Sequence, residues 1–129
     1  MYKIAAFILN LPWTLVGFFT AIISFPTKVE LFKQKFVFVF RVSNFWWYKF
    51  IHPGVRAMTH GHVILLNPQA DDLDLKHELV HIEQFNKHPL IFPALYFLES
   101  ILRGYQKNRY ENEAYTLSGS RGIQTNKPR

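Results

Sequence analysis

The chain has 129 residues, which is room for one domain, and 49% of them are hydrophobic, which is ample material for a core. It contains no cysteine, so disulfides and thiolate ligands are excluded, and any zinc would have to be bound by histidines and carboxylates. The net charge of +6 suits an anionic partner such as a membrane surface, but the basic residues are scattered and form no nucleic-acid-binding motif, so we expect no nucleic-acid partner.

The first predicted element is a hydrophobic segment at residues 4–25, which holds no charged residue. As a single helix it would be about 33 Å long, and the hydrocarbon core of a bilayer is about 30 Å thick. Asn10 and Pro12 in its middle favour a kink or two shorter helices. We expect residues 1–26 to associate with a membrane, either by spanning it or by lying in its interface; the alternative is a helix packed on the domain. If the segment spans the membrane, the lysines that follow would place the rest of the chain on the cytoplasmic side.

The next predicted elements are strands. Residues 35–42 are β-branched or aromatic with almost no break, and residues 57–66 form a second candidate strand. A turn at Pro53 and Gly54 precedes the second strand. The aromatic run at residues 45–50 is typical either of a membrane-interface belt or of a core segment, and both interpretations stay open.

Three helices are predicted after the strands. The first begins at Asp71 or Asp72, either of which can cap it, and ends before Pro89. A second, apolar helix covers residues 90–103, and a third covers residues 109–117.

The order of these elements predicts an α+β fold with an N-terminal hydrophobic helix, a small antiparallel sheet and then three helices. Residues 27–117 would form the folded domain. Residues 118–129 are polar and basic, and we expect them to form a disordered tail.

The first of the three helices contains the sequence HELVH, which has the pattern His-Glu-x-x-His. Because an α-helix turns by about 100° per residue, His77 and His81 lie about 40° apart on one face, and both imidazoles can reach one ion. Glu78 lies at the border of this face, where its carboxylate can accept a proton from a water whose pKa zinc has lowered to about 7. The pattern predicts a zinc site with Glu78 as the catalytic base; the alternative is an exposed helix that carries polar residues.

Further candidates lie on this helix and after it. Gln84 shares the face of the two histidines and is expected to support one of them. His88 lies about 10 Å along the axis from His81, too far to bind the same ion, and is expected to cap the helix or to lie on the surface. The third metal ligand must therefore come from elsewhere, and the carboxylates of NRYENEAY, Glu111 and Glu113, are the candidates.

Taken together, these motifs resemble a known group of enzymes. His-Glu-x-x-His, a second helix and then Glu-x-Glu-Ala on a third helix are similar to the gluzincin class of zinc metallopeptidases. Closer still are small bacterial proteins of unassigned function that share a Thr-x-Gly-His-Val-like strand, His-Glu-Leu-x-His-x-x-Gln and Glu-x-Glu-Ala; the matching residues here are 59–63, 77–84 and 111–114. The resemblance implies a Zn²⁺ cofactor and a peptide or protein substrate.

The resemblance also implies a third ligand. Membrane-bound zinc proteases that process prenylated proteins use a glutamate that corresponds to Glu111, whereas thermolysin-like enzymes use one that corresponds to Glu113. We expect Glu111 to be the ligand, with Ala114 allowing close helix packing. Both groups place an aspartate four residues after this glutamate to steady a histidine, and this chain has Tyr115 or Leu117 there. That departure argues against catalysis more than against metal binding.

The resemblance gives the preceding strand a role as well. In gluzincins an edge strand beside the zinc helix pairs with an extended substrate peptide, and residues 60–66 would be that strand. His60 and His62 are two residues apart, so they are expected to face one way, at the mouth of the site or on the surface. We therefore expect a membrane-associated zinc metallopeptidase; the alternative is an inactive, zinc-containing, membrane-associated protein with a binding or structural role.

Overall fold

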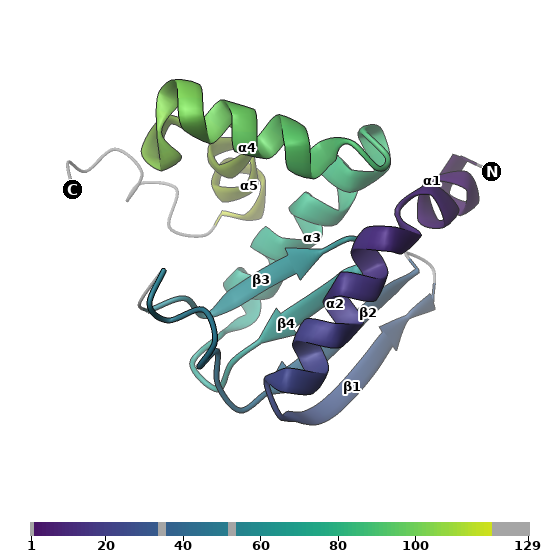
Figure 1. Ribbon diagram of the computed structural model, residues 1–129, viewed down its shortest axis with the longest axis vertical. Coiled ribbons are helices and arrows are strands. Elements are labelled where there is room, and N and C mark those ends of the chain that lie inside the picture. The colour runs from purple at the N-terminus through teal and green to yellow at the C-terminus, as the bar shows by residue number, and fades with distance from the viewer. Residues whose placement is uncertain (1, 34–35, 52–53, 120–129) are drawn as a thin grey trace.

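The chain folds into two N-terminal helices, a four-stranded sheet and three further α-helices, and the computed structural model describes residues 2–33, 36–51 and 54–119 (Figure 1). The predicted α+β class is confirmed. In chain order the elements are α1 (Tyr2–Leu9), α2 (Leu11–Ile23), β1 (Pro26–Phe32), β2 (Val37–Val42), β3 (Ala57–His60), β4 (Val63–Leu66), α3 (Asp72–Lys87), α4 (Phe92–Arg103), the short 3-10 helix η2 (Tyr105–Lys107) and α5 (Arg109–Ser118).

The hydrophobic N-terminal segment forms α1 and α2, so of the two alternatives the pair of shorter helices is confirmed. The chain breaks at Asn10, whose buried side chain donates to the Phe85 carbonyl over 3.1 Å and accepts from the Leu90 amide over 2.7 Å. Pro12 stands in the first turn of α2, where the N–H that proline lacks would have no partner within the helix. None of the described helices combines the length and the apolar character needed to cross a membrane.

The four strands form one sheet in the order β1-β2-β4-β3. β1 pairs antiparallel with β2, and β3 pairs antiparallel with β4, but β2 and β4 run parallel. The sheet is therefore mixed, and the prediction of an antiparallel sheet was wrong for this central pair. The chain reverses once to enter β3 and again to enter β4, so β4 resumes the direction of β2.

Two strand predictions were wrong in detail. β1 was not predicted, because its sequence mixes a proline and charged residues with its apolar ones and most of its side chains are exposed. The single strand predicted at residues 57–66 is a hairpin of β3 and β4 with its turn at Gly61 and His62. Gly61 has a φ of +60°, and a Cβ atom there would lie 2.4 Å from the Thr14 nitrogen. The turn thus needs glycine both for its left-handed backbone and for its close approach to α2.

The sheet carries an apolar core on each of its faces. Because successive side chains of a strand point to opposite faces, Val63 packs with Ala21 of α2, whereas Ile64 packs with Ile82 of α3. α2 and α3 therefore cover opposite faces of the sheet (Figure 1). This packing fixes α3, with its two histidines, alongside the sheet.

The three helices after the sheet agree closely with their predicted ranges. Asp71 caps α3: its carboxylate accepts from the Asp74 amide, and the Asp74 carboxylate accepts from the Asp71 amide, which is a capping box. His88 is the C-cap residue of α3, in accord with the capping role expected for it. α4 and α5 begin and end within two residues of the predicted ranges 90–103 and 109–117.

The aromatic run at residues 45–50 is divided between the core and the surface. Phe45 is buried and Trp47 packs against it in the core on the α2 face of the sheet. Trp46 and Phe50 are exposed. The core interpretation therefore holds for Phe45 and Trp47, and the interpretation as a membrane-interface belt stays a prediction for the exposed residues.

Two predicted features fall partly outside the described residues. Of the turn at Pro53 and Gly54, only Gly54 is described, with a φ of +83°. Of the predicted tail, Ser118 is the last residue of α5 and Gly119 follows it as a left-handed cap, while residues 120–129 lie outside the described part of the chain.

Candidate metal centre

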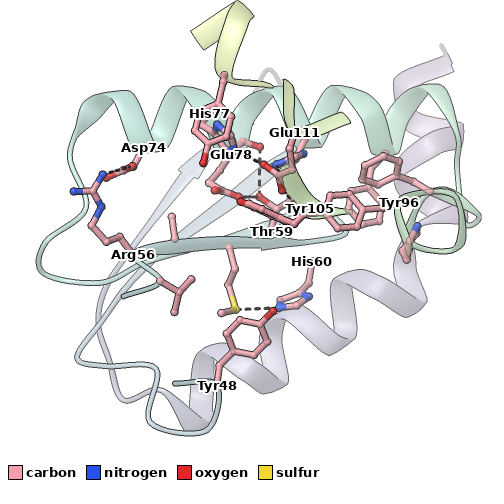
Figure 2. A pocket seen from close by; sticks show the side chains of 18 of the residues that line it. Tyr48, Arg56, Thr59, His60, Asp74, His77, Glu78, Tyr96, Tyr105 and Glu111 are labelled. Carbon is pink, nitrogen blue, oxygen red and sulfur yellow. Dashed lines mark hydrogen bonds and ion pairs between the residues drawn. The ribbon is translucent and has the colours of Figure 1, made fainter. Parts of the chain in front are cut away.

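A cavity of about 550 Å³ surrounds the outer edge of β3, the edge that faces away from β4 (Figure 2). On one side of the strand its wall includes Tyr48 and His60; on the other it includes Thr59, Glu78 and Glu111. No strand in residues 2–33, 36–51 or 54–119 pairs with this edge, and all four residues of β3 line the cavity.

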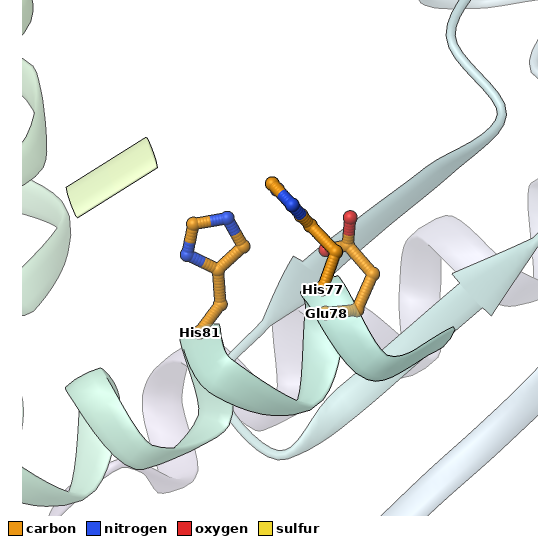
Figure 3. Close-up of side chains that lie close together, drawn as sticks. All are labelled: His77, Glu78 and His81. Atoms are coloured by element: carbon orange, nitrogen blue, oxygen red, sulfur yellow. The ribbon is translucent and has the colours of Figure 1, made fainter. Parts of the chain in front are cut away.

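The two histidines of α3 project from the same side of the helix (Figure 3). His77 and His81 are both buried, and their ring centroids lie 4.9 Å apart. One ligand atom from each histidine and one from Glu78 all lie within 4.8 Å of one another. These three side chains form a cluster that could hold a metal ion.

Glu111 of α5 also meets both histidines. Its carboxylate oxygen Oε1 lies 2.9 Å from His77 Nε2, and its Oε2 lies 3.4 Å from His81 Nε2. Glu113, the alternative third ligand, instead accepts a hydrogen bond of 2.6 Å from Gln84. Of the two candidate glutamates, Glu111 is the one that the fold brings to the histidines.

Gln84 sets the orientation of His81. Its side-chain nitrogen donates to the Tyr110 carbonyl and to Glu113, so its side-chain oxygen is the atom that faces His81 Nδ1, at 2.8 Å. His81 must therefore carry a proton on Nδ1, and its Nε2 points toward Glu111. A histidine held this way by a neighbouring acceptor has the tautomer that a metal ligand requires.

The site is built around a positive charge. In a neutral His81 with its proton on Nδ1, the Nε2 lone pair would face the Glu111 carboxylate, so a proton or a metal ion is needed between them. Burial acts to lower the pKa of His81, but the charge and hydrogen bond of Glu111 outweigh it and raise that pKa to about 9. Burial acts to raise the pKa of Glu111, but the two imidazoles bring it well below its usual range.

One atom of the cluster is also left without a partner. His77 Nδ1 is buried and makes no hydrogen bond within the described part of the chain. A buried imidazole nitrogen without a partner is unfavourable unless something else binds the ring. Two imidazoles and a carboxylate are a donor set that zinc and other divalent transition metals accept, so the residues present fit a metal ion.

Glu78 is also hydrogen-bonded to β3. Its carboxylate oxygen Oε1 accepts a hydrogen bond of 2.6 Å from the Thr59 hydroxyl. Burial raises the pKa of Glu78, although the two histidines and the Thr59 hydrogen bond act in the opposite direction. A carboxylate with a raised pKa is better suited to accept and return a proton at neutral pH.

Three tyrosines complete the wall of the site on the side of α4 and α5. The Tyr96 hydroxyl donates to Glu111 Oε2, and the Tyr115 ring packs against the His77 ring with centroids 4.3 Å apart. Burial, and next the charge of Glu111, raise the pKa of Tyr105 and that of Tyr96. The Tyr96 and Tyr105 hydroxyls therefore stay protonated near neutral pH and can act as hydrogen-bond donors.

Asn108 fixes where Glu111 and Tyr96 meet. Its side chain is fully buried, and its oxygen caps α5 by accepting from the amides of Tyr110 and Glu111 over 2.9 and 3.3 Å. Its nitrogen donates to the Tyr96 carbonyl over 3.2 Å and to the Ser100 hydroxyl over 2.8 Å. One residue thus joins α4 to the first turn of α5, which carries Glu111.

The prediction that residues 60–66 form the edge strand was wrong, because β4 pairs with both β2 and β3 and the free edge belongs to β3. The two histidines of the predicted strand also lie apart, contrary to expectation. His62 is fully buried away from the cavity, with Nδ1 3.0 Å from the Phe36 carbonyl, because the turn at Gly61 interrupts the alternation of a strand. His60 lines the cavity with its Nε2 3.2 Å from Met58 Sδ, and burial lowers its pKa to about 4.

Sequence reasoning missed several residues of the site. Thr59, Tyr96 and Tyr105 were given no role, although Thr59 belongs to a quoted motif. Aromatic residues on apolar helices look like ordinary core residues in a sequence. No spacing rule connects residues on separate elements, so only their positions relative to Glu78 and Glu111 could identify them.

Comparison with known proteins gave no match for this chain among protein-family models, curated proteins or solved structures. The resemblance to gluzincins therefore stays a prediction from the motifs.

Proposed function

We propose that the protein is a zinc-dependent metallopeptidase that hydrolyses peptide bonds with Glu78 as general base. The observation that carries the proposal is the convergence of His77, His81 and Glu111 from two helices, beside a buried Glu78, on the wall of a cavity. A helix that only happened to carry polar residues would expose them to solvent, whereas all four of these side chains are buried.

His77, His81 and Glu111 would hold the metal. When bound, zinc supplies a Lewis acid that polarises a carbonyl and lowers the pKa of a water to about 7. Glu78 has one carboxylate oxygen on the Thr59 hydroxyl, which leaves the other to accept the proton of the attacking water and to return it to the departing amine. Gln84 keeps His81 in its required tautomer throughout.

The free edge of β3 would bind the substrate backbone. An extended peptide that pairs with this edge by strand addition would lie beside Thr59, which contacts Glu78 directly. The cavity around the edge has aromatic walls, to which Tyr48, Phe97 and Tyr105 contribute. A peptide with apolar side chains near the scissile bond suits such a wall.

A second candidate is a zinc-containing protein without catalytic activity, and one contact favours it. Tyr115 stands where the resembled enzymes have an aspartate that steadies a histidine, and its ring packs against His77 at a tilt of 57°. His77 Nδ1 has no hydrogen-bond partner among the described residues. In this reading the metal joins α3 to α5, and the cavity binds a peptide without cleaving it.

Conservative substitutions on the same helix separate the two candidates. Glu78→Gln should keep zinc bound but lower the hydrolysis of a fluorogenic peptide library by about 100-fold or more, because the base is lost while the ligands stay. Glu83→Gln, the same change on α3 outside the cavity lining, should leave both zinc content and hydrolysis unchanged. A chelator should abolish hydrolysis in every active form.

Two outcomes would contradict the proposal. If Glu78→Gln is as active as the unsubstituted protein, Glu78 is not the base. If the zinc-loaded protein binds peptides but cleaves none of them, the second candidate is correct.

A further inference from the structure

The burial pattern of α2 is the reverse of the one usual for a helix that packs on a sheet. The residues that it buries against the sheet are small or polar: Thr14, Gly17, Thr20 and Ala21. The residues that it exposes are large and apolar: Leu11, Leu15, Phe19 and Ile22, with exposed fractions of 62% for Phe19 and 66% for Ile22. At about 100° per residue these four side chains lie within an arc of about 80°, so they form one continuous stripe.

Packing fixes the direction of this stripe. Gly17 lies so close to β4 that a Cβ atom would be 2.5 Å from Val63 Cβ, and α2 therefore rests directly on the sheet. Its apolar stripe then points away from the sheet. Figure 1 shows α2 in front of the sheet, with no described element lying across it.

Neighbouring elements extend the stripe into a broader surface. Val29 and Leu31 of β1 are exposed and alternate with Phe32, which packs on the α3 side, so they lie on the same face of the sheet as α2. At the other end, the Trp13 indole donates to the Leu90 carbonyl over 2.8 Å, which places exposed Leu90 beside the start of α2. We call this set, with the four α2 residues, the apolar α2 surface.

The charges around this surface have one sign. Lys28 and Glu30 of β1 and Arg41 of β2 share strand faces with Phe32 and Val39, which pack on the α3 side, so these charges point away from the apolar α2 surface. Exposed Lys33 directly follows Leu31, and exposed Lys49 lies in the aromatic run whose Trp46 indole donates to the Ile23 carbonyl at the end of α2. Five of the nine acidic residues of the chain instead lie between positions 71 and 83, on α3 and its cap, and α3 covers the opposite face of the sheet. The acidic residues are therefore concentrated on the side of the sheet opposite the apolar α2 surface.

We propose that the apolar α2 surface docks into the interface of a membrane that contains anionic lipids, with α2 parallel to the membrane plane. Large apolar side chains enter the boundary between headgroups and acyl chains, and basic residues around them meet the lipid phosphates. A second copy of the chain fits less well, because a twofold contact through this face would bring two basic regions together. This inference is independent of the proposed catalytic activity.

Vesicle binding by the full-length protein tests the proposal. We expect the protein to float with vesicles that mix phosphatidylcholine and phosphatidylserine, and to bind them about tenfold more weakly when phosphatidylserine is omitted. Leu15→Ser combined with Phe19→Ser should reduce binding by at least about tenfold, because two large apolar anchors are lost. Leu73→Ser combined with Leu117→Ser, at exposed positions on α3 and α5, is the matched control and should bind normally.

Because the chain contains no cysteine, a single introduced cysteine can carry a fluorescent dye. The fluorescence of this dye gives a second readout that does not depend on weakened binding. A polarity-sensitive dye on Leu15→Cys should shift to the blue on addition of vesicles, and the same dye on Leu73→Cys should not. Equal flotation of a folded Leu15→Ser, Phe19→Ser variant and the unsubstituted protein would overturn the proposal. So would a dimer in solution that this variant dissociates, together with no binding to vesicles.

Discussion

Asn108 makes two kinds of contact that can be separated by substitution. Its oxygen caps α5, and its nitrogen ties that cap to the Tyr96 carbonyl and the Ser100 hydroxyl of α4. Aspartate and asparagine are nearly equal as helix caps, so an aspartate here would preserve the first function only. Comparing the free energies of unfolding of an alanine variant and an aspartate variant therefore isolates the contribution of the contacts between α4, which carries Tyr96, and α5, which carries Glu111.

We expect Asn108→Ala to lower the free energy of unfolding by about 2–4 kcal/mol, because it removes a cap and leaves buried backbone groups unpaired. Asn108→Asp should lower it by about 1–3 kcal/mol, because a buried carboxylate would face the Tyr96 carbonyl. Urea denaturation of both variants checks these values. An Asn108→Asp variant within about 0.5 kcal/mol of the unsubstituted protein would show that the contacts to α4 do not stabilise the fold.

His60 gives the fold a dependence on pH that can be assigned to one residue. Burial lowers the pKa of His60 to about 4, whereas an unfolded histidine titrates near 6.5. Below pH 6.5 the unfolded chain therefore binds a proton that the folded chain does not, so stability is lost as the pH falls from about 6.5 to about 4.

We expect the free energy of unfolding of His60→Gln to fall by about 1–2 kcal/mol less than that of the unsubstituted protein over this pH range, after allowance for the partial exposure of the ring. The measurement is the difference in unfolding free energy between pH 7.5 and about 4.5 for both proteins, with a chelator present so that metal release does not contribute. Identical pH profiles would mean that His60 is solvated in the folded protein.

Single residues of the site were predictable only where local geometry fixes them. The spacing of His77 and His81 determines their common face on any α-helix. In the structure the two rings lie side by side on that face. The choice between Glu111 and Glu113 needed a resemblance, because a helix alone does not show which side faces a distant element. Thr59 acts across a sheet edge, and no local rule predicts such a contact.

The contact between α2 and the sheet depends on one glycine. A Cβ atom at Gly17 would lie 2.5 Å from Val63 Cβ and 2.8 Å from the His60 carbonyl oxygen, and both are parts of the β3–β4 hairpin that borders the site. Because the clash involves a backbone atom and the root of a side chain, rotation of a side chain cannot relieve it. The hairpin or the helix must move.

We expect Gly17→Ala to lower the free energy of unfolding by about 1–3 kcal/mol through overpacking. In an unconstrained helix the same change raises stability by up to about 1 kcal/mol, so the sign of the effect is the test. Val16→Ala, on the exposed side of α2, should change stability by less than about 0.5 kcal/mol in the same urea titration. A stabilised Gly17→Ala variant would contradict the close packing.

Helices were more predictable than strands in this chain. Caps and prolines mark the ends of α3, and the ranges of α4 and α5 follow from apolar runs bounded by glycine or polar residues. β1 lacks such marks, since it is an edge strand with few buried side chains. The β3–β4 hairpin looked like one strand because Gly61 and His62 interrupt it for only two residues.

For the whole molecule, the sequence indicated the α+β class but not the mixed order of the sheet. That order matters for function, because it puts β3 at an edge, next to α3, and leaves its outer side open to the cavity. The site then needs α3, α5 and β3 together. Any variant that separates these elements should lose metal affinity even when every ligand is present.

The metal content of purified protein and of two single variants, measured by mass spectrometry after dialysis against zinc, tests whether His77, His81 and Glu111 together bind the ion. We expect about one zinc ion per chain in the unsubstituted protein and in Glu113→Ala, because Glu113 contacts Gln84 and not the histidines. Glu111→Ala should retain less than about a tenth of that zinc, because it removes the carboxylate that meets both imidazoles. A protein that binds no zinc, or a site that Glu113→Ala empties while Glu111→Ala leaves it filled, would contradict the account.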